Sequence, residues 1–231
     1  MMDISKRLLA LGALSCVVAA APAGAQVNWA AWTAATTGST TGTATGSINA
    51  SGGPVGVSYT GDVTFAQINN SGTNYWTPAS TFTNATSGAG PTRPDIVALN
   101  GGTSTGTNTI TFSTPVNNLF MAIVSLGPGS QFNFNHAFTI LGQGPDNWGG
   151  SNTSLTMSGN TLFGNEGSGV IEFTGPISSI SWTDPSPEYW HGFTVGADAI
   201  AQQSTVPEPS SLALLGTGLV SLVPMARRRR K

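Results

Sequence analysis

Aromatic residues beside hydrogen-bonding side chains are the clearest candidates for chemistry in this 231-residue sequence. Trp148 follows Asp146 and Asn147 in a glycine-rich segment, and Trp190 ends a segment that contains two prolines. The flat face of a tryptophan can stack on a sugar ring, while a carboxylate or amide can bond its hydroxyl groups. Asp146, Asn147, Trp148 and Trp190 are therefore candidate sugar-binding residues, and the default alternative is that the tryptophans only cover one end of a domain. Two further pairs of similar character are Tyr75–Trp76 and Tyr189–Trp190.

Acidic and nucleophilic residues give weaker support for enzymatic chemistry. Asp184 and Glu188 can be imagined as the carboxylate pair of a glycosidase, but two prolines separate them in a predicted loop, where a carboxylate is usually solvated. Ser104 lies in a G-x-S-x-G pattern. In hydrolases that pattern needs a turn from a strand into a helix, whereas here it falls in a Gly/Thr loop. We therefore expect no catalytic residue among these three.

The two histidines, His136 and His191, offer little to a metal or a reaction. His136 alternates with phenylalanines along a predicted strand, so it is expected to be a hydrogen-bonded core residue. His191 lies near a loop. Neither has an acidic residue at ligand spacing, and the D-x-D-x-D-G pattern of a calcium loop does not occur. The sequence predicts no cofactor, no enzymatic activity and no identifiable metal ligands, with calcium held by loop carboxylates as the alternative.

Charge is distributed very unevenly along the chain. Two basic residues stand near its start and five at its end, whereas residues 26–205 contain one, Arg93, against eight acidic residues. An acidic surface of this kind repels phosphate and has no cationic stripe from which counterions are released. Nucleic acid is therefore excluded as a partner.

Residues 1–25 have the three parts of a secretory signal peptide. Two basic residues precede an apolar run, and small residues, among them Ala23 and Ala25, precede Gln26. The apolar run is shorter than the about 20 residues of a bilayer span. We expect signal peptidase to cut between Ala25 and Gln26, with an uncleaved anchor as the alternative. The single cysteine, Cys16, lies before the cut, so the mature chain would have no thiol.

Residues 206–231 form a tail of three parts. A Pro-Glu-Pro motif is followed by an apolar stretch from Leu212 to Ala226 and by a basic end. This arrangement resembles the PEP-CTERM sorting signal, which marks exported proteins for an exosortase, an intramembrane processing enzyme. The residues that carry the resemblance are Val206, Pro207, Glu208 and Pro209, with the flanking Arg227, Arg228, Arg229 and Arg230. The resemblance implies a Gram-negative bacterium that makes extracellular polysaccharide, with exosortase as a partner of the protein.

The physical character of this tail agrees with that role. Each proline fixes its own φ and pushes the preceding residue toward an extended conformation, so the motif is a stiff strand with one exposed carboxylate. The 15 residues from Leu212 to Ala226 would form a single membrane helix of about 22 Å, shorter than the hydrocarbon core of about 30 Å, so the arginines must snorkel. Basic residues stay cytoplasmic, which places residues 26–205 outside. A permanent anchor without processing is the alternative.

Residues between these terminal segments predict an all-β domain. Short segments alternate polar and apolar residues, and Gly, Pro, Asn and Asp separate them. The clearest alternation runs from Gln131 to Leu141, and the continuous apolar run from Leu119 to Leu126 predicts a central strand. A strand that begins at Asn108 is expected to end at Pro115, and Gly61-Asp62 to form a hairpin turn. About ten such strands favour an antiparallel two-sheet sandwich that is jelly-roll-like, with an up-and-down barrel as the alternative.

Residues 36–46 form a low-complexity stretch of threonine, glycine, serine and alanine. This composition favours a flexible loop. A segment that carries glycans and a flat threonine array that orders water are the two alternatives. The glycines argue against the array because they interrupt a regular strand.

These observations lead to one functional hypothesis. We expect an exported protein that is anchored transiently in the membrane of the cell envelope by its C-terminus and then reaches the cell surface or the extracellular space. Its role would be structural or adhesive, in exopolysaccharide or a biofilm. A carbohydrate-binding module is the first alternative and a secreted glycoside hydrolase the second.

Overall fold

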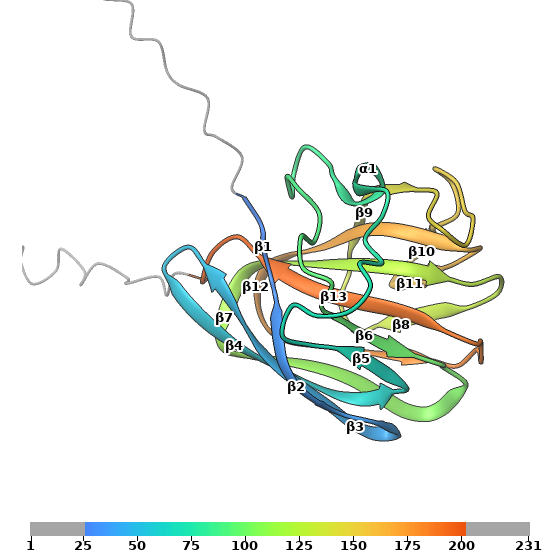
Figure 1. The fold of residues 1–231 in the computed structure, drawn as a ribbon, viewed down its shortest axis with the longest axis horizontal. Helices are drawn as coiled ribbons and strands as arrows, with labels where there is room; N and C mark the ends of the chain where they lie inside the picture. Colours follow the sequence, from blue (N-terminus) through green and yellow to red (C-terminus); the bar gives the residue numbers. More distant parts are fainter. Residues whose placement is uncertain (1–25, 202–231) are drawn as a thin grey trace, which may run out of the picture.

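The computed structural model describes residues 26–201, whose regular structure is almost entirely β-strand (Figure 1). The helix within this range, α1 (Ala79–Phe82), has four residues, and no helix of the described residues has the length and hydropathy to cross a membrane. The all-β prediction is confirmed. The strands are β1 (Asn28–Trp29), β2 (Ala31–Thr36), β3 (Gly38–Ala50), β4 (Gly53–Val63), β5 (Phe65–Gln67), β6 (Ile96–Leu99), β7 (Thr103–Leu126), β8 (Gln131–Phe134), β9 (Thr139–Gly144), β10 (Thr156–Ser158), β11 (Thr161–Phe163), β12 (Gly167–Asp184) and β13 (His191–Ala197).

Antiparallel pairing joins these elements in one 13-stranded sheet. Its centre is formed by β7 and β12, the two longest strands, which pair along most of their length. On its other side, β7 pairs with β4 near its start and with β13 near its end, so the sheet divides there into two branches. One branch continues through β4, β3 and β2, and the other through β13, β6 and β5. The finer two-sheet, jelly-roll arrangement stays a prediction.

Pro115 does not end the strand in which it lies. Strand β7 continues past it to Leu126 because the pairing with β12 is irregular at this point, with register shifts between Thr174 and Ile177 and between Ile177 and Ser179. Prolines are tolerated in strands at such irregularities, where their missing N–H interrupts no regular ladder. The predicted end at Pro115 is therefore wrong, and one uninterrupted strand contributes to both branches.

The apolar end of β7 is buried on both faces, as predicted for a central strand. Alternate side chains point to opposite faces of a strand. Leu119, Met121 and Ile123 face the main core, and Phe120, Ala122 and Val124 face a second, smaller core. The main core also contains aromatic residues of four other strands, namely Tyr59, Phe132, Phe134, Trp182 and Phe193.

Residues 68–95 cover the second core and contain little regular structure apart from α1. We call this stretch the covering segment; it passes over the sheet near β9 and β13 in Figure 1. Trp76 and Phe82 from this segment pack edge to face, with ring centroids 5.3 Å apart, against Phe120 and its neighbours on the sheet. The burial of these two rings holds the segment on the sheet, and with it the neighbouring Tyr75.

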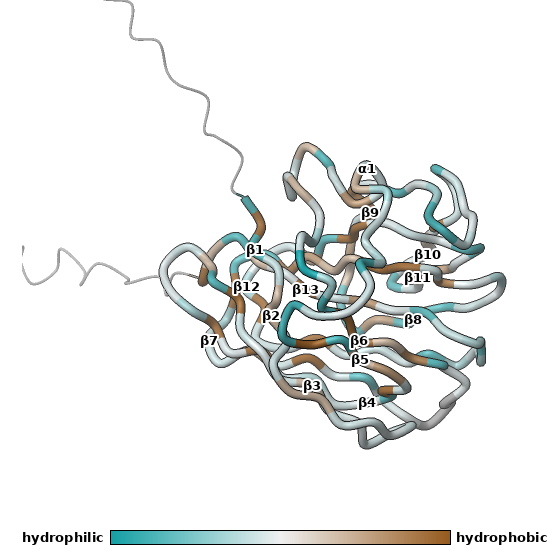
Figure 2. Tube along the Cα trace, viewed as in Figure 1, coloured by the Kyte–Doolittle hydropathy of each residue, from teal (hydrophilic) through white to brown (hydrophobic). Residues whose placement is uncertain are grey.

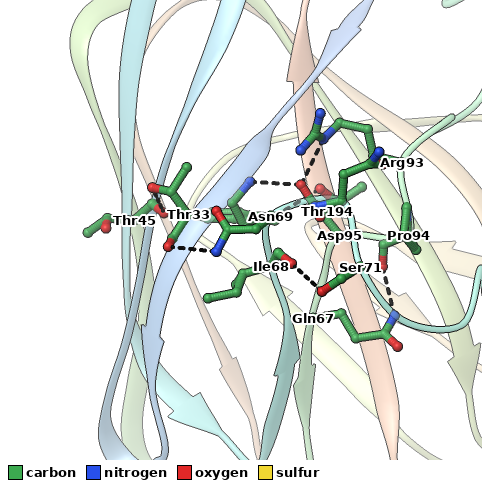
Figure 3. A network of polar contacts seen from close by, with 12 residues as sticks. Thr33, Thr45, Gln67, Ile68, Asn69, Ser71, Arg93, Pro94, Asp95 and Thr194 are labelled. Carbon is green, nitrogen blue, oxygen red and sulfur yellow. Dashed lines mark hydrogen bonds and ion pairs between the residues drawn. The ribbon is translucent and has the colours of Figure 1, made fainter.

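Asp95 fastens the end of the covering segment to the sheet (Figure 3). Its carboxylate is 1% exposed and accepts hydrogen bonds from the backbone N–H groups of Trp32, at 3.2 Å, and Asn70, at 2.6 Å. The guanidinium of Arg93 completes the set with an Nε–Oδ2 ion pair of 2.8 Å. A buried carboxylate is costly unless donors compensate it, and here three donors do so.

Residues 36–46 lie mainly in strand β3 and are not the predicted flexible loop. Strand β3 pairs with both β2 and β4, and its threonines have a high preference for strands. A Cβ on Gly42 would lie 2.6 Å from the Cβ of Val63, and one on Gly46 would clash with the carbonyl oxygen of Ala31. The glycines therefore allow close approach between strands. The many Gly, Ser and Thr residues leave most of the chain pale in Figure 2, between hydrophilic and hydrophobic.

The predicted hairpin at Gly61-Asp62 is wrong. Strand β4 continues through these residues to Val63, and β5 pairs with β6 instead of β4. The Asp62 carboxylate explains the difference, because it accepts hydrogen bonds from the backbone N–H groups of Asn100, at 2.7 Å, and Gly101, at 2.9 Å. A residue engaged with the connection between β6 and β7 is not free to close a local turn.

The alternating segment from Gln131 to Leu141 is divided into β8 and β9. The break follows Phe134 because the backbone N–H of Asn135 donates a hydrogen bond to the Ser181 carbonyl, at 2.9 Å, and the Asn135 side-chain Oδ1 accepts one from the Ser181 N–H, also at 2.9 Å. His136 lies in this break and is half-buried, with its Nδ1 2.8 Å from the Asn135 Oδ1. The prediction that His136 is a core residue is therefore wrong.

Candidate functional site

Three aromatic side chains from distant parts of the sequence meet at the surface. Tyr75 comes from the covering segment, Trp148 from the loop after β9, and Trp190 from the residue before β13. Their ring centroids are 5.7 Å apart for Tyr75–Trp148, 5.1 Å for Tyr75–Trp190 and 5.1 Å for Trp148–Trp190. Trp148 is 45% exposed. We call these three residues the aromatic cluster, and its rings offer an apolar surface to a ligand.

The aromatic cluster borders a cavity of about 400 Å³. This volume lies within the range of sites for small organic ligands. The lining combines rings with hydroxyl groups and two carboxylates, and consists of Tyr75, Ser125, Pro128, Trp148, Glu166, Glu188, Tyr189 and Trp190. A mixed lining of this kind provides both stacking and hydrogen bonding.

Asp146 shapes the loop that presents Trp148. Its Oδ1 accepts hydrogen bonds from the backbone N–H groups of Trp148, at 2.8 Å, and Gly149, at 3.1 Å, which is a turn that aspartate side chains commonly form. Its Oδ2 accepts a hydrogen bond from the hydroxyl of Ser168. Asn147 is exposed, and its Nδ2 donates to the Thr77 Oγ1 at 3.2 Å. Of the four predicted sugar-binding residues, the structure brings Trp148 and Trp190 together and engages Asp146 within its own loop.

Glu166 is the cavity carboxylate with fewer protein partners. Its Oε2 accepts a hydrogen bond from the Ser125 Oγ at 3.1 Å, and among residues 26–201 no donor contacts its other oxygen. Both residues have positive φ angles, 53° for Glu166 and 56° for Ser125. Positive φ is uncommon for residues other than glycine, and outside Asn and Asp it indicates a constrained backbone. The backbone thus holds this hydroxyl–carboxylate pair at the cavity in an unusual conformation.

Glu188 is held firmly on the protein side of the cavity. Its Oε2 accepts hydrogen bonds from the backbone N–H of Gly127 and the hydroxyl of Ser130, both at 2.7 Å. Its Oε1 forms an ion pair with the Nδ1 of His191. Both oxygens are engaged, so Glu188 contributes a fixed negative charge to the cavity wall.

His191 lies behind Glu188 at the start of β13 and has no exposed side-chain surface. Its Nε2 is 2.7 Å from the Oδ2 of Asp184, which is also fully buried. The imidazole therefore stands between two carboxylates, in ion pairs that are not aligned as hydrogen bonds. The expectations that Asp184 is solvated and that His191 lacks an acidic neighbour are wrong. The two prolines between Asp184 and Glu188 turn the chain so that both carboxylates reach one ring.

The pKa values of this buried group follow from its surroundings. Burial by itself lowers the pKa of His191, but contact with Asp184 and Glu188 outweighs burial and raises this pKa to about 9. Burial raises the pKa of Asp184, and the neighbouring His191 partly opposes that rise. At neutral pH His191 is therefore a cation, and it compensates part of the negative charge behind the cavity.

We expect the protein to lose stability as the pH rises above neutrality. The pKa of His191 is about 9 in the folded chain and about 6.5 in an unfolded one, so its contribution is complete below pH 6.5 and disappears as the pH approaches 9. The free energy of unfolding should fall by about 3 kcal/mol over this window. Urea unfolding at pH 6, 7.5 and 9 measures the change. His191→Gln should flatten the profile and His136→Gln should not; an unchanged profile in His191→Gln would contradict the assignment.

The remaining sequence candidates lie elsewhere. Ser104 falls in strand β7, and a further strand segment, not a helix, follows it, so the G-x-S-x-G pattern lacks the turn that a hydrolase needs. Trp76 is 2% exposed and belongs to the second core, whereas Tyr189 is 97% exposed. The sequence did not predict Ser125 and Glu166 as cavity residues, because neither belongs to a motif and only the pairing of β7 with β12 brings them together.

A comparison with known protein families finds a match for the C-terminal tail. Residues 205–231 match the family model of the PEP-CTERM protein-sorting motif, which confirms the resemblance inferred from residues 206–231. The motif indicates a secreted protein that an exosortase processes and that is destined for the cell surface. No curated protein and no solved structure matches the chain. The motif, the predicted signal peptide with Ala23 and Ala25, and the arginines from Arg227 onward lie outside the described residues, whereas Gln26 is the first residue within them and is exposed.

Proposed function

We propose that residues 26–201 form a non-enzymatic domain that binds polysaccharide through the aromatic cluster. The protein would then have an adhesive or structural role in exopolysaccharide or a biofilm. The observation that supports this proposal is that Tyr75, Trp148 and Trp190 converge beside a cavity of about 400 Å³, which is also lined by hydrogen-bonding groups. Sugar rings have apolar faces that stack on aromatic side chains and hydroxyl groups that bond carboxylates.

The same proposal includes the route by which the protein is exported. Signal peptidase removes residues 1–25, and the apolar stretch from Leu212 to Ala226 anchors the chain transiently in the membrane until exosortase acts. The sorting motif at residues 205–231 supports this order of events. Residues 26–201 contain a single arginine and no lysine, which suits a domain on the outer side of the membrane.

A secreted glycoside hydrolase is the second candidate, because two carboxylates, Glu166 and Glu188, line one cavity. Such an enzyme needs two carboxyl groups that can both act on the substrate, one as the general acid and the other as the base or nucleophile, and of the two in the cavity only Glu166 has an oxygen without a donor among the described residues. Both oxygens of Glu188 are already engaged by protein groups. Asp184, whose pKa is raised by burial, has no exposed side-chain surface. We therefore favour binding over hydrolysis.

The binding proposal predicts a clear effect of removing either tryptophan. Trp148→Ala and Trp190→Ala should each weaken binding of the bacterium's own exopolysaccharide by roughly 10- to 100-fold, since loss of a stacked aromatic anchor costs about 1–3 kcal/mol. Isothermal titration calorimetry with the full-length chain measures this effect. Phe65→Ala is the matched control, because Phe65 is also a partly exposed ring, at 38%, but does not line the cavity. Unchanged affinity in both tryptophan variants would contradict the proposal, and release of reducing sugars would favour the hydrolase.

A further inference from the structure

The charged groups around the cavity are almost all negative. Its lining contains two carboxylates, Glu166 and Glu188, and no lysine, arginine or histidine. Behind the wall, the positive charge of His191 is flanked by Asp184 as well as by Glu188. In residues 26–201 as a whole, the one arginine faces eight acidic residues, and it is paired with Asp95. The field in the cavity therefore attracts cations and repels uronic acids and other anions.

The aromatic cluster adds a second feature that suits a cation. The face of an aromatic ring carries partial negative charge, and several rings around one site form a cage for an organic ammonium group. Two indoles and one phenol meet here with centroids 5.1 to 5.7 Å apart. Tryptophan is the strongest of these partners for a cation. A neutral sugar would use the rings for stacking and leave the charge of Glu166 without an ionic partner among the described residues.

Glu166 provides the position for a direct ion pair. Ser125 occupies one of its oxygens, at 3.1 Å, and no donor of the described residues contacts the other. Glu188, in contrast, has both oxygens engaged. An ammonium group in the cavity can therefore bond the second oxygen of Glu166 while its alkyl side lies against the rings.

We propose that this cavity selects a protonated amine, and that its ligand in the matrix is a polysaccharide with free 2-amino sugars. The inference rests on the proposed polysaccharide binding and names the sugar class within it. Three kinds of group at one site carry it: the adjoining aromatic rings, the carboxylate of Glu166 with an oxygen open to a ligand, and a lining without any basic side chain.

The test compares a glucosamine tetramer with an N-acetylglucosamine tetramer, which has the same ring but no charge. Calorimetry with the full-length chain at pH 6, where amines are protonated, should give at least tenfold tighter binding of the glucosamine tetramer, and this preference should shrink as salt is raised. Equal affinity for both tetramers would overturn the inference and leave polysaccharide binding intact. Failure of both tetramers and of the native exopolysaccharide would remove both proposals. Choline chloride is the third ligand, and affinity equal to that of glucosamine would overturn the assignment to an amino sugar.

Glu166→Gln distinguishes the contribution of the ion pair to binding affinity from the contribution of the cavity's shape. This variant keeps the size of the side chain and an acceptor for Ser125 but removes the charge, so it should lower affinity for the glucosamine tetramer about tenfold and leave the weaker binding of the acetylated tetramer unchanged. Glu172→Gln is the matched control, because Glu172 lies outside the cavity lining and the same charge is removed. Equal loss for both tetramers in Glu166→Gln, or equal loss in the control, would overturn a specific role for Glu166.

Discussion

Replacing Asp95 with alanine is expected to lower the free energy of unfolding by about 3–5 kcal/mol. The substitution removes the acceptor for two backbone N–H groups, those of Trp32 and Asn70, and the ionic partner of Arg93. Trp32 has no exposed surface, so its N–H would be left buried without an acceptor. The covering segment would also lose one of its attachments to β2, while the hydrogen bond from the Asn69 N–H to the Trp32 carbonyl, at 2.8 Å, would remain.

Urea unfolding followed by tryptophan fluorescence measures the effect of Asp95→Ala. Asp198→Ala is the control, because the Asp198 carboxylate is half-buried and accepts a hydrogen bond only from the adjacent Ala199 N–H among the described residues. We expect the control to change stability by less than about 1 kcal/mol. Equal effects of the two variants would mean that the Asp95 network adds nothing beyond an ordinary surface carboxylate.

Replacing Asp184 with asparagine is expected to cost about 3 kcal/mol or more, since it leaves the buried imidazolium of His191 with a single carboxylate. The pKa of His191 should fall from about 9 because one of the two groups that raise it is lost. Unfolding experiments measure the first effect, and titration of the His191 ring by NMR measures the second. The volume of the side chain is nearly unchanged, so a cavity cannot explain the loss.

A double-mutant cycle tests whether this cost comes from the ion pair. Asp184→Asn combined with His191→Gln should destabilise the protein by about 1–3 kcal/mol less than the sum of the two single variants. Such non-additivity is expected for residues in contact or in one network of ion pairs, and not for distant, independent positions. Additive costs, or an unchanged titration of His191 in Asp184→Asn, would contradict the ion pair.

Local sequence patterns predicted the features that depend on local composition. The apolar run from Leu119 to Leu126 identified a central strand, because a strand buried on both faces needs apolar residues without alternation. Trp148 and Trp190 were singled out because each ring stands beside polar loop residues; the structure brings the two rings together, and their role in sugar binding stays a prediction. The tail from residue 206 was found because its three parts follow one another directly in the chain.

Features that depend on partners distant in the sequence were missed. The glycines of β3 resemble those of a flexible linker until β2 and β4 are seen to approach too closely for a Cβ. Asp184 and His191 are seven positions apart in a segment with two prolines, and no periodicity indicates that the chain folds back to pair them. Glu166 and Ser125 are brought into contact only by the pairing of β12 with β7, so the local sequence around either residue gives no sign of the other. Composition predicts which faces are buried, but not which polar groups meet.

Strand β13 also separates the aromatic cluster from the two ends of the described chain. Trp190 precedes this strand, whose seven residues span about 20 Å, and Ala197 at its far end pairs with Asn28 of β1. The described chain thus starts and finishes beside each other, at the opposite end of β13 from the aromatic rings. If the protein is tethered at either end of residues 26–201, the proposed sugar-binding end points away from the tether, with the body of the domain as a spacer between them.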